Sequence, residues 1–194
     1  MLSTSTLKEL SLSSALGAVD EGAAFVDLRP VRNYLDVHIP RSLSLQYENG
    51  PGFQSRARDC IPLDIPLVLL HDEAADMIWA AACLRGRGFA VLGTVQDGLN
   101  AWANVHGTPA STEIYRGPQP RRARVLDVTD PGTTGATDAT TIPIEQLWGR
   151  APELKDERRV VVAFGYGVRA ALAVGILERT GIDDVIAWDT RGTF

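Results

Sequence analysis

The sequence predicts an α/β protein in which one strand–loop–helix unit occurs twice. Two observations carry this prediction. Residues 66–70 and residues 159–163 each contain a continuous aliphatic run, which is typical of parallel strands covered on both faces. Each run leads through a short loop into a helical pattern, and the two loops begin at His71 and Phe164. We therefore expect two small, mostly parallel sheets, each with helices on both faces.

The remaining elements recur in the same order, which indicates an internal repeat. Each copy has an early apolar run that closes on aspartate, a short segment after it, a helix that ends near a glycine, and a short strand. The corresponding segments are 24–29 and 124–129, then loosely 43–45 and 142–144, then 84–89 and 177–182, then 90–92 and 185–187. A glycine at a helix end readily adopts the left-handed conformation that stops the helix.

The repeat divides the chain into a first domain at residues 1–106 and a second, shorter domain at residues 124–194. Between them, residues 107–123 contain several glycines and prolines, which interrupt regular elements, so we expect a linker there. The two copies should pack against each other about a pseudo-two-fold axis and bury apolar surface. Residues 129–138 are rich in threonine and glycine and should form an irregular loop.

Composition excludes several classes of function. The net charge of −5 gives no footprint for nucleic acid or for an anionic membrane surface. No apolar run approaches the ~18 residues that a transmembrane helix needs, and the N-terminal residues do not have the pattern of a signal peptide. The two cysteines, Cys60 and Cys83, suggest a reducing compartment, and we expect the cytoplasm. No residue pattern points to a cofactor.

Three segments in the first half resemble conserved blocks of the rhodanese family of sulfurtransferases. Residues 26–30 and 38–40 match the family pattern Asp-x-Arg followed by His-Ile-Pro-Gly-Ala, although Arg41 and Ser42 replace its glycine and alanine. Residues 91–102 resemble the closing block, a strand, two glycines and a helix that carries a tryptophan, and Asp97 replaces the first glycine. The second half keeps less of these patterns.

The resemblance extends to the active-site loop, and there the residue that performs the chemistry is missing. In the family this loop begins with the cysteine that carries sulfur and continues x-x-Gly-x-Arg-Ser. His71 and Phe164 stand at that first position in the two copies. Sulfur transfer through a persulfide needs a thiolate, and the related phosphatases need the same cysteine. The resemblance therefore implies a sulfurtransferase fold without sulfurtransferase turnover.

The first loop is acidic, because Asp72, Glu73 and Asp76 follow His71. These carboxylates should repel thiosulfate or phosphate. A metal site formed by His71, Asp72 and Asp76 is the functional alternative, but carboxylates in a first helical turn are explained by the helix dipole alone. We expect no metal.

The second loop keeps more of the form that binds anions. Gly165 and Gly167 permit a tight turn, Tyr166 lies between them, and Arg169 stands at the arginine position of the family. A small oxyanion could be held there by backbone amides. The alternative is that the loop keeps its shape because the strand-to-helix turn needs it, with Phe164 filling the pocket.

Other residues are assigned structural roles. By resemblance, Asp27 and Arg29 pair and brace the loops, and His38 is a hydrogen-bonded histidine at a turn. The four tryptophans, Trp79, Trp102, Trp148 and Trp188, should be core or half-buried, and Cys83 should be buried on its helix.

The leading functional hypothesis is a binding or interaction module, linked to sulfur metabolism, that docks an unidentified protein partner near Phe164, Tyr166 and Phe194. The first alternative is an enzyme: a divergent sulfurtransferase that uses Cys60, or a hydrolase built on His71. The second alternative is a pair of copies that dimerises and binds no ligand.

Overall fold

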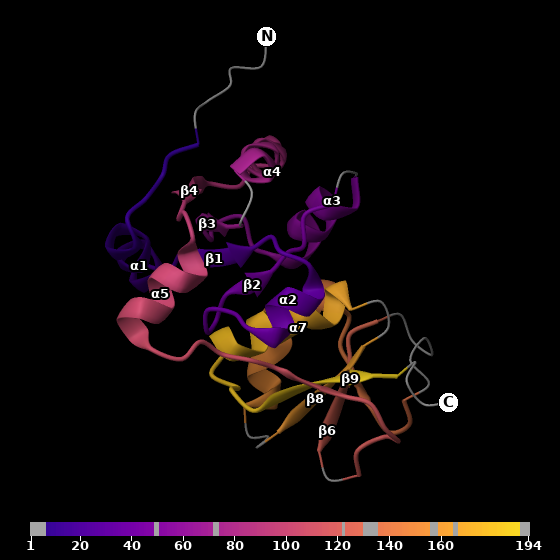
Figure 1. The fold of residues 1–194 in the computed structure, drawn as a ribbon. Helices are drawn as coiled ribbons and strands as arrows, with labels where there is room; N and C mark the ends of the chain where they lie inside the picture. Colours follow the sequence, from indigo (N-terminus) through magenta and orange to yellow (C-terminus); the bar gives the residue numbers. More distant parts are fainter. Residues whose placement is uncertain are drawn as a thin grey trace.

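The computed structural model describes residues 7–48, 51–71, 74–121, 123–129, 136–155, 159–164 and 167–190. Of the residues singled out above, Asp72, Glu73, Gly165, Tyr166 and Phe194 lie outside the described part. The chain folds into two parallel sheets joined through a helix that packs against both (Figure 1).

The first sheet has the strand order β2-β1-β3-β4, and each of its strand pairs is parallel. The strands are β1 (Ala24–Asp27), β2 (Leu43–Ser44), β3 (Leu67–Leu70) and β4 (Val91–Thr94). Strands β1 and β3 are buried along their whole length, as expected for central strands of a parallel sheet.

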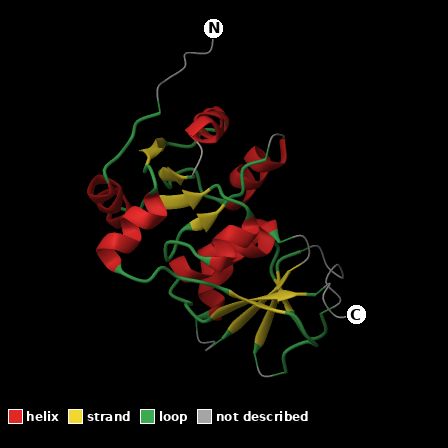
Figure 2. Cartoon of the chain, viewed as in Figure 1, coloured by secondary structure: helices red, strands yellow, loops and turns green. Residues whose placement is uncertain are grey.

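Helices cover both faces of the first sheet (Figure 2). Alternate strand residues point to opposite faces, so Phe25 and Val68 pack against α1 (Leu12–Asp20) and α5 (Gly98–His106). Their neighbours Val26 and Leu69 belong to the core that contains residues of α3 (Pro51–Cys60) and α4 (Ala74–Gly86). A short helix, α2 (Val31–Asp36), follows β1.

The second sheet has the order β5-β9-β8-β6-β7 and is also parallel throughout. Its strands are β5 (Glu113–Tyr115), β6 (Arg124–Asp127), β7 (Thr140–Thr141), β8 (Val160–Phe164) and β9 (Val185–Asp189). The helical elements of this half are α6 (Ile144–Arg150), the 3-10 helix η1 (Ala151–Leu154) and α7 (Val168–Arg179). The predicted α/β class with parallel sheets flanked by helices is confirmed.

The two faces of the second sheet are packed differently. Leu126 and Val162 belong to the same core as α6 and α7. On the other face, Val161 and Trp188 pack with residues that, in the described part of the chain, come from strands and loops rather than from helices. The expectation of helices on both faces is therefore met by the first sheet and not by the described part of the second. None of the described helices is long and apolar enough to cross a membrane.

Helix α7 connects the two halves. Residues 170–178 are all buried, because the helix packs against β8 and β9 of its own sheet and against β2 and α2 of the first half (Figure 1). One hydrophobic core contains residues of both halves, including Leu43 and Leu172. The prediction that the halves pack together and bury apolar surface is confirmed, while their pseudo-two-fold relation stays a prediction.

The expectation that residues 107–123 lack regular structure is wrong. Strand β5 lies inside this segment and pairs with β9, and Ala110 forms an antiparallel bridge with His38. The glycines and prolines flank these pairings rather than interrupt them, because Pro109 precedes Ala110 and Gly117 follows β5. The segment therefore forms backbone pairings with both the first half and the second sheet.

Two expectations about helix α4 also fail. Trp79 is 65% exposed instead of buried, and Cys83 is half-buried. Helix α4 carries apolar side chains all around its axis, so its sequence does not indicate which side faces the core.

The contact between α7 and β2 depends on Gly175. A Cβ atom at this position would collide with the carbonyl oxygen of Ser42 and lie 3.0 Å from the Tyr34 hydroxyl and 3.1 Å from the Cα of Leu43. Two of these three atoms belong to the backbone, so a side chain at position 175 requires the helix or the strand to move.

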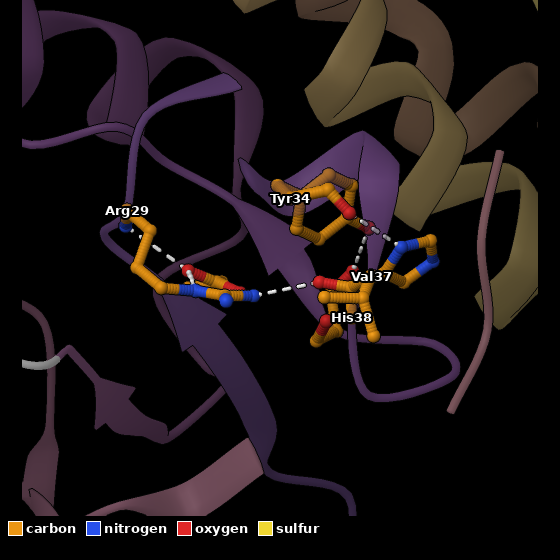
Figure 3. A network of polar contacts seen from close by, with 6 residues as sticks. Arg29, Tyr34, Val37 and His38 are labelled. Carbon is orange, nitrogen blue, oxygen red and sulfur yellow. Dashed lines mark hydrogen bonds and ion pairs between the residues drawn. The ribbon is translucent and has the colours of Figure 1, made fainter. Parts of the chain in front are cut away.

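A buried polar network lies beside this contact. His38 is fully buried, and its Nδ1 lies 2.8 Å from the carbonyl oxygen of Tyr34 (Figure 3). The other ring nitrogen, Nε2, lies 2.9 Å from Glu178 Oε1. The backbone N–H of Arg41 donates to Glu178 Oε2 at 2.8 Å. Glu178 is 7% exposed, so a single buried carboxylate from α7 contacts both the His38 ring and the Arg41 N–H of the first half.

We predict that Gly175→Ala lowers the free energy of unfolding by about 1–3 kcal/mol, because the added methyl group overpacks a contact made largely by backbone. Urea unfolding monitored by circular dichroism measures the change. Gly149→Ala is the matched control, since a Cβ at this helical position meets no atom within 4 Å. An equally small effect of both substitutions would contradict the close approach of α7 to β2.

We predict that Glu178→Ala lowers the free energy of unfolding by about 3 kcal/mol, because it leaves buried His38 and the N–H of Arg41 without their carboxylate. Glu153→Ala, which removes an exposed partner of Arg150, should leave stability essentially unchanged. The same urea titration tests both variants, and equal stability of the two would show that Glu178 does not hold the halves together.

Candidate functional site

A cavity of about 670 Å³ opens at the carboxyl ends of the strands of the first sheet. We call it the strand-end cavity. Arg29 follows β1, His71 follows β3 and Thr94 ends β4, and all three line it. Ligands of parallel α/β sheets bind in crevices at this edge, where loops and helix starts surround the strand ends. The remaining lining residues are Leu7, Glu9, Met77, Ile78, Gln96, Asp97, Leu99 and Asn100.

The N-terminal segment forms one wall of this cavity. Glu9 forms a parallel bridge with Thr94, whose N–H donates to the carbonyl oxygen of Lys8 at 2.9 Å and whose carbonyl accepts from Leu10 at 2.8 Å. Gly93 permits this pairing, because a Cβ there would collide with the carbonyl oxygen of Lys8. The segment thus extends the sheet beyond β4 and places Glu9 in the lining.

The first predicted loop contributes a histidine and a carboxylate that face each other. His71 Nε2 lies 3.8 Å from Asp76 Oδ2, and both side chains are half-buried. The structure therefore brings together two of the four residues predicted here, and the other two, Asp72 and Glu73, lie outside the described residues. Among the described residues no three or more histidine, cysteine or acidic side chains group as metal ligands do.

The cationic side chain of the cavity is already neutralised. Arg29 Nη2 lies 2.7 Å from Asp27 Oδ2, its Nε lies 3.0 Å from Oδ1, and both side chains are buried. The same Nη2 donates to the carbonyl oxygen of Val37 at 2.8 Å (Figure 3). A bidentate pair of this kind fixes the strand end to the segment before His38. Because Glu9 and Asp97 add carboxylates to the lining, the cavity offers an oxyanion little attraction.

In the second half, hydrogen bonds between Asp127 and Thr129 stand in place of the Asp27–Arg29 ion pair. Asp127 Oδ1 accepts hydrogen bonds from the N–H of Thr129 at 2.9 Å and from its Oγ1 at 2.7 Å. Gly167, with φ of 87°, precedes α7, and Arg169 lies half-buried in the first turn of that helix. Phe164 ends β8, but its side chain and the next two residues lie outside the described part.

Neither cysteine of the chain lines the strand-end cavity. Cys60 is 3% exposed at the end of α3, and burial, followed by the charges of Glu145 and Asp59, raises the pKa of its thiol to about 12. Cys83 is half-buried and packs against the common core. Because its pKa is so high, the Cys60 thiol is protonated at neutral pH and is a poor nucleophile.

Sequence reasoning missed the N-terminal wall of the cavity and the role of Glu178. For Glu178 a signal existed, because this carboxylate directly follows the apolar run at residues 170–177. For Glu9 no local signal existed, since its place depends on pairing with a strand far along the chain.

Comparison with known proteins gives a relative for about half of the chain. No family model matches. A thiosulfate sulfurtransferase, GlpE, of Pseudomonas savastanoi pv. phaseolicola is 30% identical over 95 residues, which cover 49% of this chain and 86% of that protein.

Solved structures give weaker resemblances. The Alr3790 protein of Anabaena sp. matches 51% of this chain and 79% of its own, with 20% identity and a TM-score of 0.43. The SseA 3-mercaptopyruvate sulfotransferase of Escherichia coli matches 94% of this chain and 98% of its own, with 15% identity and a TM-score of 0.40. The assignment rests on the sequence relative: the chain belongs to the rhodanese-like sulfurtransferase family.

Proposed function

We propose that this protein is a tandem rhodanese-like binding module that does not turn over sulfur. One observation carries the proposal: both thiols of the chain lie away from the strand-end cavity, and that of Cys60 is buried with its pKa raised to about 12. Family chemistry requires a thiolate where the donor binds. His71, which occupies the loop position after β3, cannot carry a sulfane sulfur.

Strand order supports the tandem arrangement. The first sheet runs β2-β1-β3-β4, and the second contains the corresponding order β7-β6-β8-β9 with β5 added at one edge. Helices α4 and α7 follow the third strand of their respective halves. We propose that both halves derive from one rhodanese-like unit and that residues 107–123 join them.

The charges around the strand-end cavity also argue against sulfur transfer, independently of the missing thiol. Glu9, Asp76 and Asp97 lie in or beside the lining, whereas the guanidinium of Arg29 is paired with Asp27. Thiosulfate is a dianion and would be repelled by these carboxylates. A neutral or cationic group of a protein partner fits this lining better.

We propose a protein partner as the ligand, and the second loop with Arg169 remains a candidate for a small oxyanion. Two cysteines without a disulfide agree with a reducing compartment such as the cytoplasm.

A second candidate function is hydrolysis with His71 as a general base, which the His71–Asp76 pair favours. The described lining residues include no serine or cysteine, and the hydroxyl of Thr94 donates to the carbonyl oxygen of Leu69 at 3.0 Å. Such an enzyme would have to activate water directly. Loss of an ester- or amide-cleaving activity in His71→Ala would establish this candidate.

We predict that the purified protein produces no more thiocyanate from thiosulfate and cyanide than its Cys60→Ala/Cys83→Ala variant, because neither thiol reaches the donor site. The assay compares both proteins at equal concentration, with an active sulfurtransferase as the positive control. Turnover by the native protein that disappears when Cys60 or Cys83 alone is replaced would contradict the proposal.

A further inference from the structure

A second cavity, of about 350 Å³, shares no lining residue with the strand-end cavity. Arg41, from the loop before β2, and Arg179, at the end of α7, both line it, and we call it the arginine cavity. The other lining residues come from α1, β1, the same loop and α5. The arginine cavity therefore straddles the contact between the two halves.

Among the described residues, no acidic side chain lies within ion-pair distance of the guanidinium of Arg41 or of Arg179. Asp20 also lines the cavity, and both Asp20 and Arg41 are exposed. Arg179 donates one hydrogen bond, from Nη1 to the carbonyl oxygen of Ala23 at 3.3 Å, and lies 5.6 Å from the ring centroid of Trp148. Most of its five N–H donors remain available.

The two charges also act on each other. Burial lowers the pKa of the Arg179 guanidinium, and the charge of Arg41 lowers it further. Arginine keeps its proton in proteins despite such shifts, so both groups stay cationic and repel. An anion placed between them would remove this repulsion and use the free donors.

The backbone of Arg41 has a conformation that is unusual for a residue with a side chain. Its φ of 65° lies in the left-handed region, which is costly for any residue with a Cβ and natural for glycine. The hydrogen bond from its N–H to Glu178 could be made equally well by a glycine. Residues strained in this way cluster at ligand-binding and active sites.

The indole ring of Trp102 also lines the arginine cavity. Trp102 is half-buried, stacks on His106 with a centroid distance of 4.9 Å, and faces the cavity together with Leu16 and Val19. We propose that the arginine cavity binds a small phosphate monoester, with the phosphate held between Arg41 and Arg179 and a planar apolar group packed against Trp102. Guanidinium groups bind phosphate through paired hydrogen bonds, and a dianion matches two of them.

The size of the cavity limits the ligand. A volume of about 350 Å³ is near the lower end of small-molecule sites, which span ~300–1,000 Å³. One ring and one phosphate fit, whereas a dinucleotide does not. Because the arginines belong to different halves, the bound ester also strengthens the contact that α7 makes with the first half.

Phenyl phosphate is the probe, with binding measured by calorimetry at low ionic strength. The intact protein should bind it, and Arg41→Gly and Arg179→Gln should each weaken binding about tenfold or more. Arg150→Gln, which replaces an exposed arginine paired with Glu153, should bind as the native protein does. Arg41→Gly relieves the left-handed strain, so its midpoint of thermal unfolding should equal or exceed that of the native protein. A loss of binding in this variant is therefore not a loss of folding.

Nuclear magnetic resonance locates the site, because the indole N–H of Trp102 should shift on titration while that of exposed Trp79 should not. Absence of binding at millimolar phenyl phosphate, unchanged affinity in both arginine variants, or a shift at Trp79 instead of Trp102 would overturn the proposal. Equal affinity for inorganic phosphate would overturn the part that assigns an apolar group to Trp102.

Discussion

Helix α7 has to lie directly against the backbone of β2, and the arrangement of the two halves depends on this contact. Gly175 makes the approach possible, and the buried run at residues 170–178 fills the space between the sheets. Since α7 packs on its own sheet with one side and on the first half with the other, the two halves share a core. Beside this contact, the Glu178 carboxylate accepts from the N–H of Arg41 and lies against the buried ring of His38.

The fold and the site have diverged to different degrees. Parallel strands, buried alternation and the Asp27–Arg29 brace keep the loop after β3 at the strand-end cavity, as the family fold requires. Under the proposed function, sulfur chemistry at that cavity would need one thiolate, and His71 stands where the family resemblance puts the cysteine. Fold stability comes from many buried contacts, whereas sulfur transfer comes from a single thiolate, so one can persist without the other.

The central parallel strands β3 and β8 were predictable, because a short aliphatic run between loop residues and a helical pattern is typical of a buried parallel strand. His71 could also be placed at the strand-end cavity from its position after the run of β3. The exposure of Trp79 could not be predicted, since helix α4 is apolar on all sides and only the packed structure selects its buried face. Strand β5 could not be predicted, because prolines and glycines on either side of it are typical of a linker without regular structure. Arg41 and Arg179 lie far apart in sequence, and only the packing of α7 brings them together.

The central claim is that this protein forms no persulfide, and mass spectrometry of the intact protein after incubation with thiosulfate tests it most directly. The account predicts no species heavier by one sulfur atom, because Cys60 is buried and protonated and Cys83 packs against the core. A stoichiometric sulfur adduct that maps to either cysteine and is discharged by cyanide would contradict it.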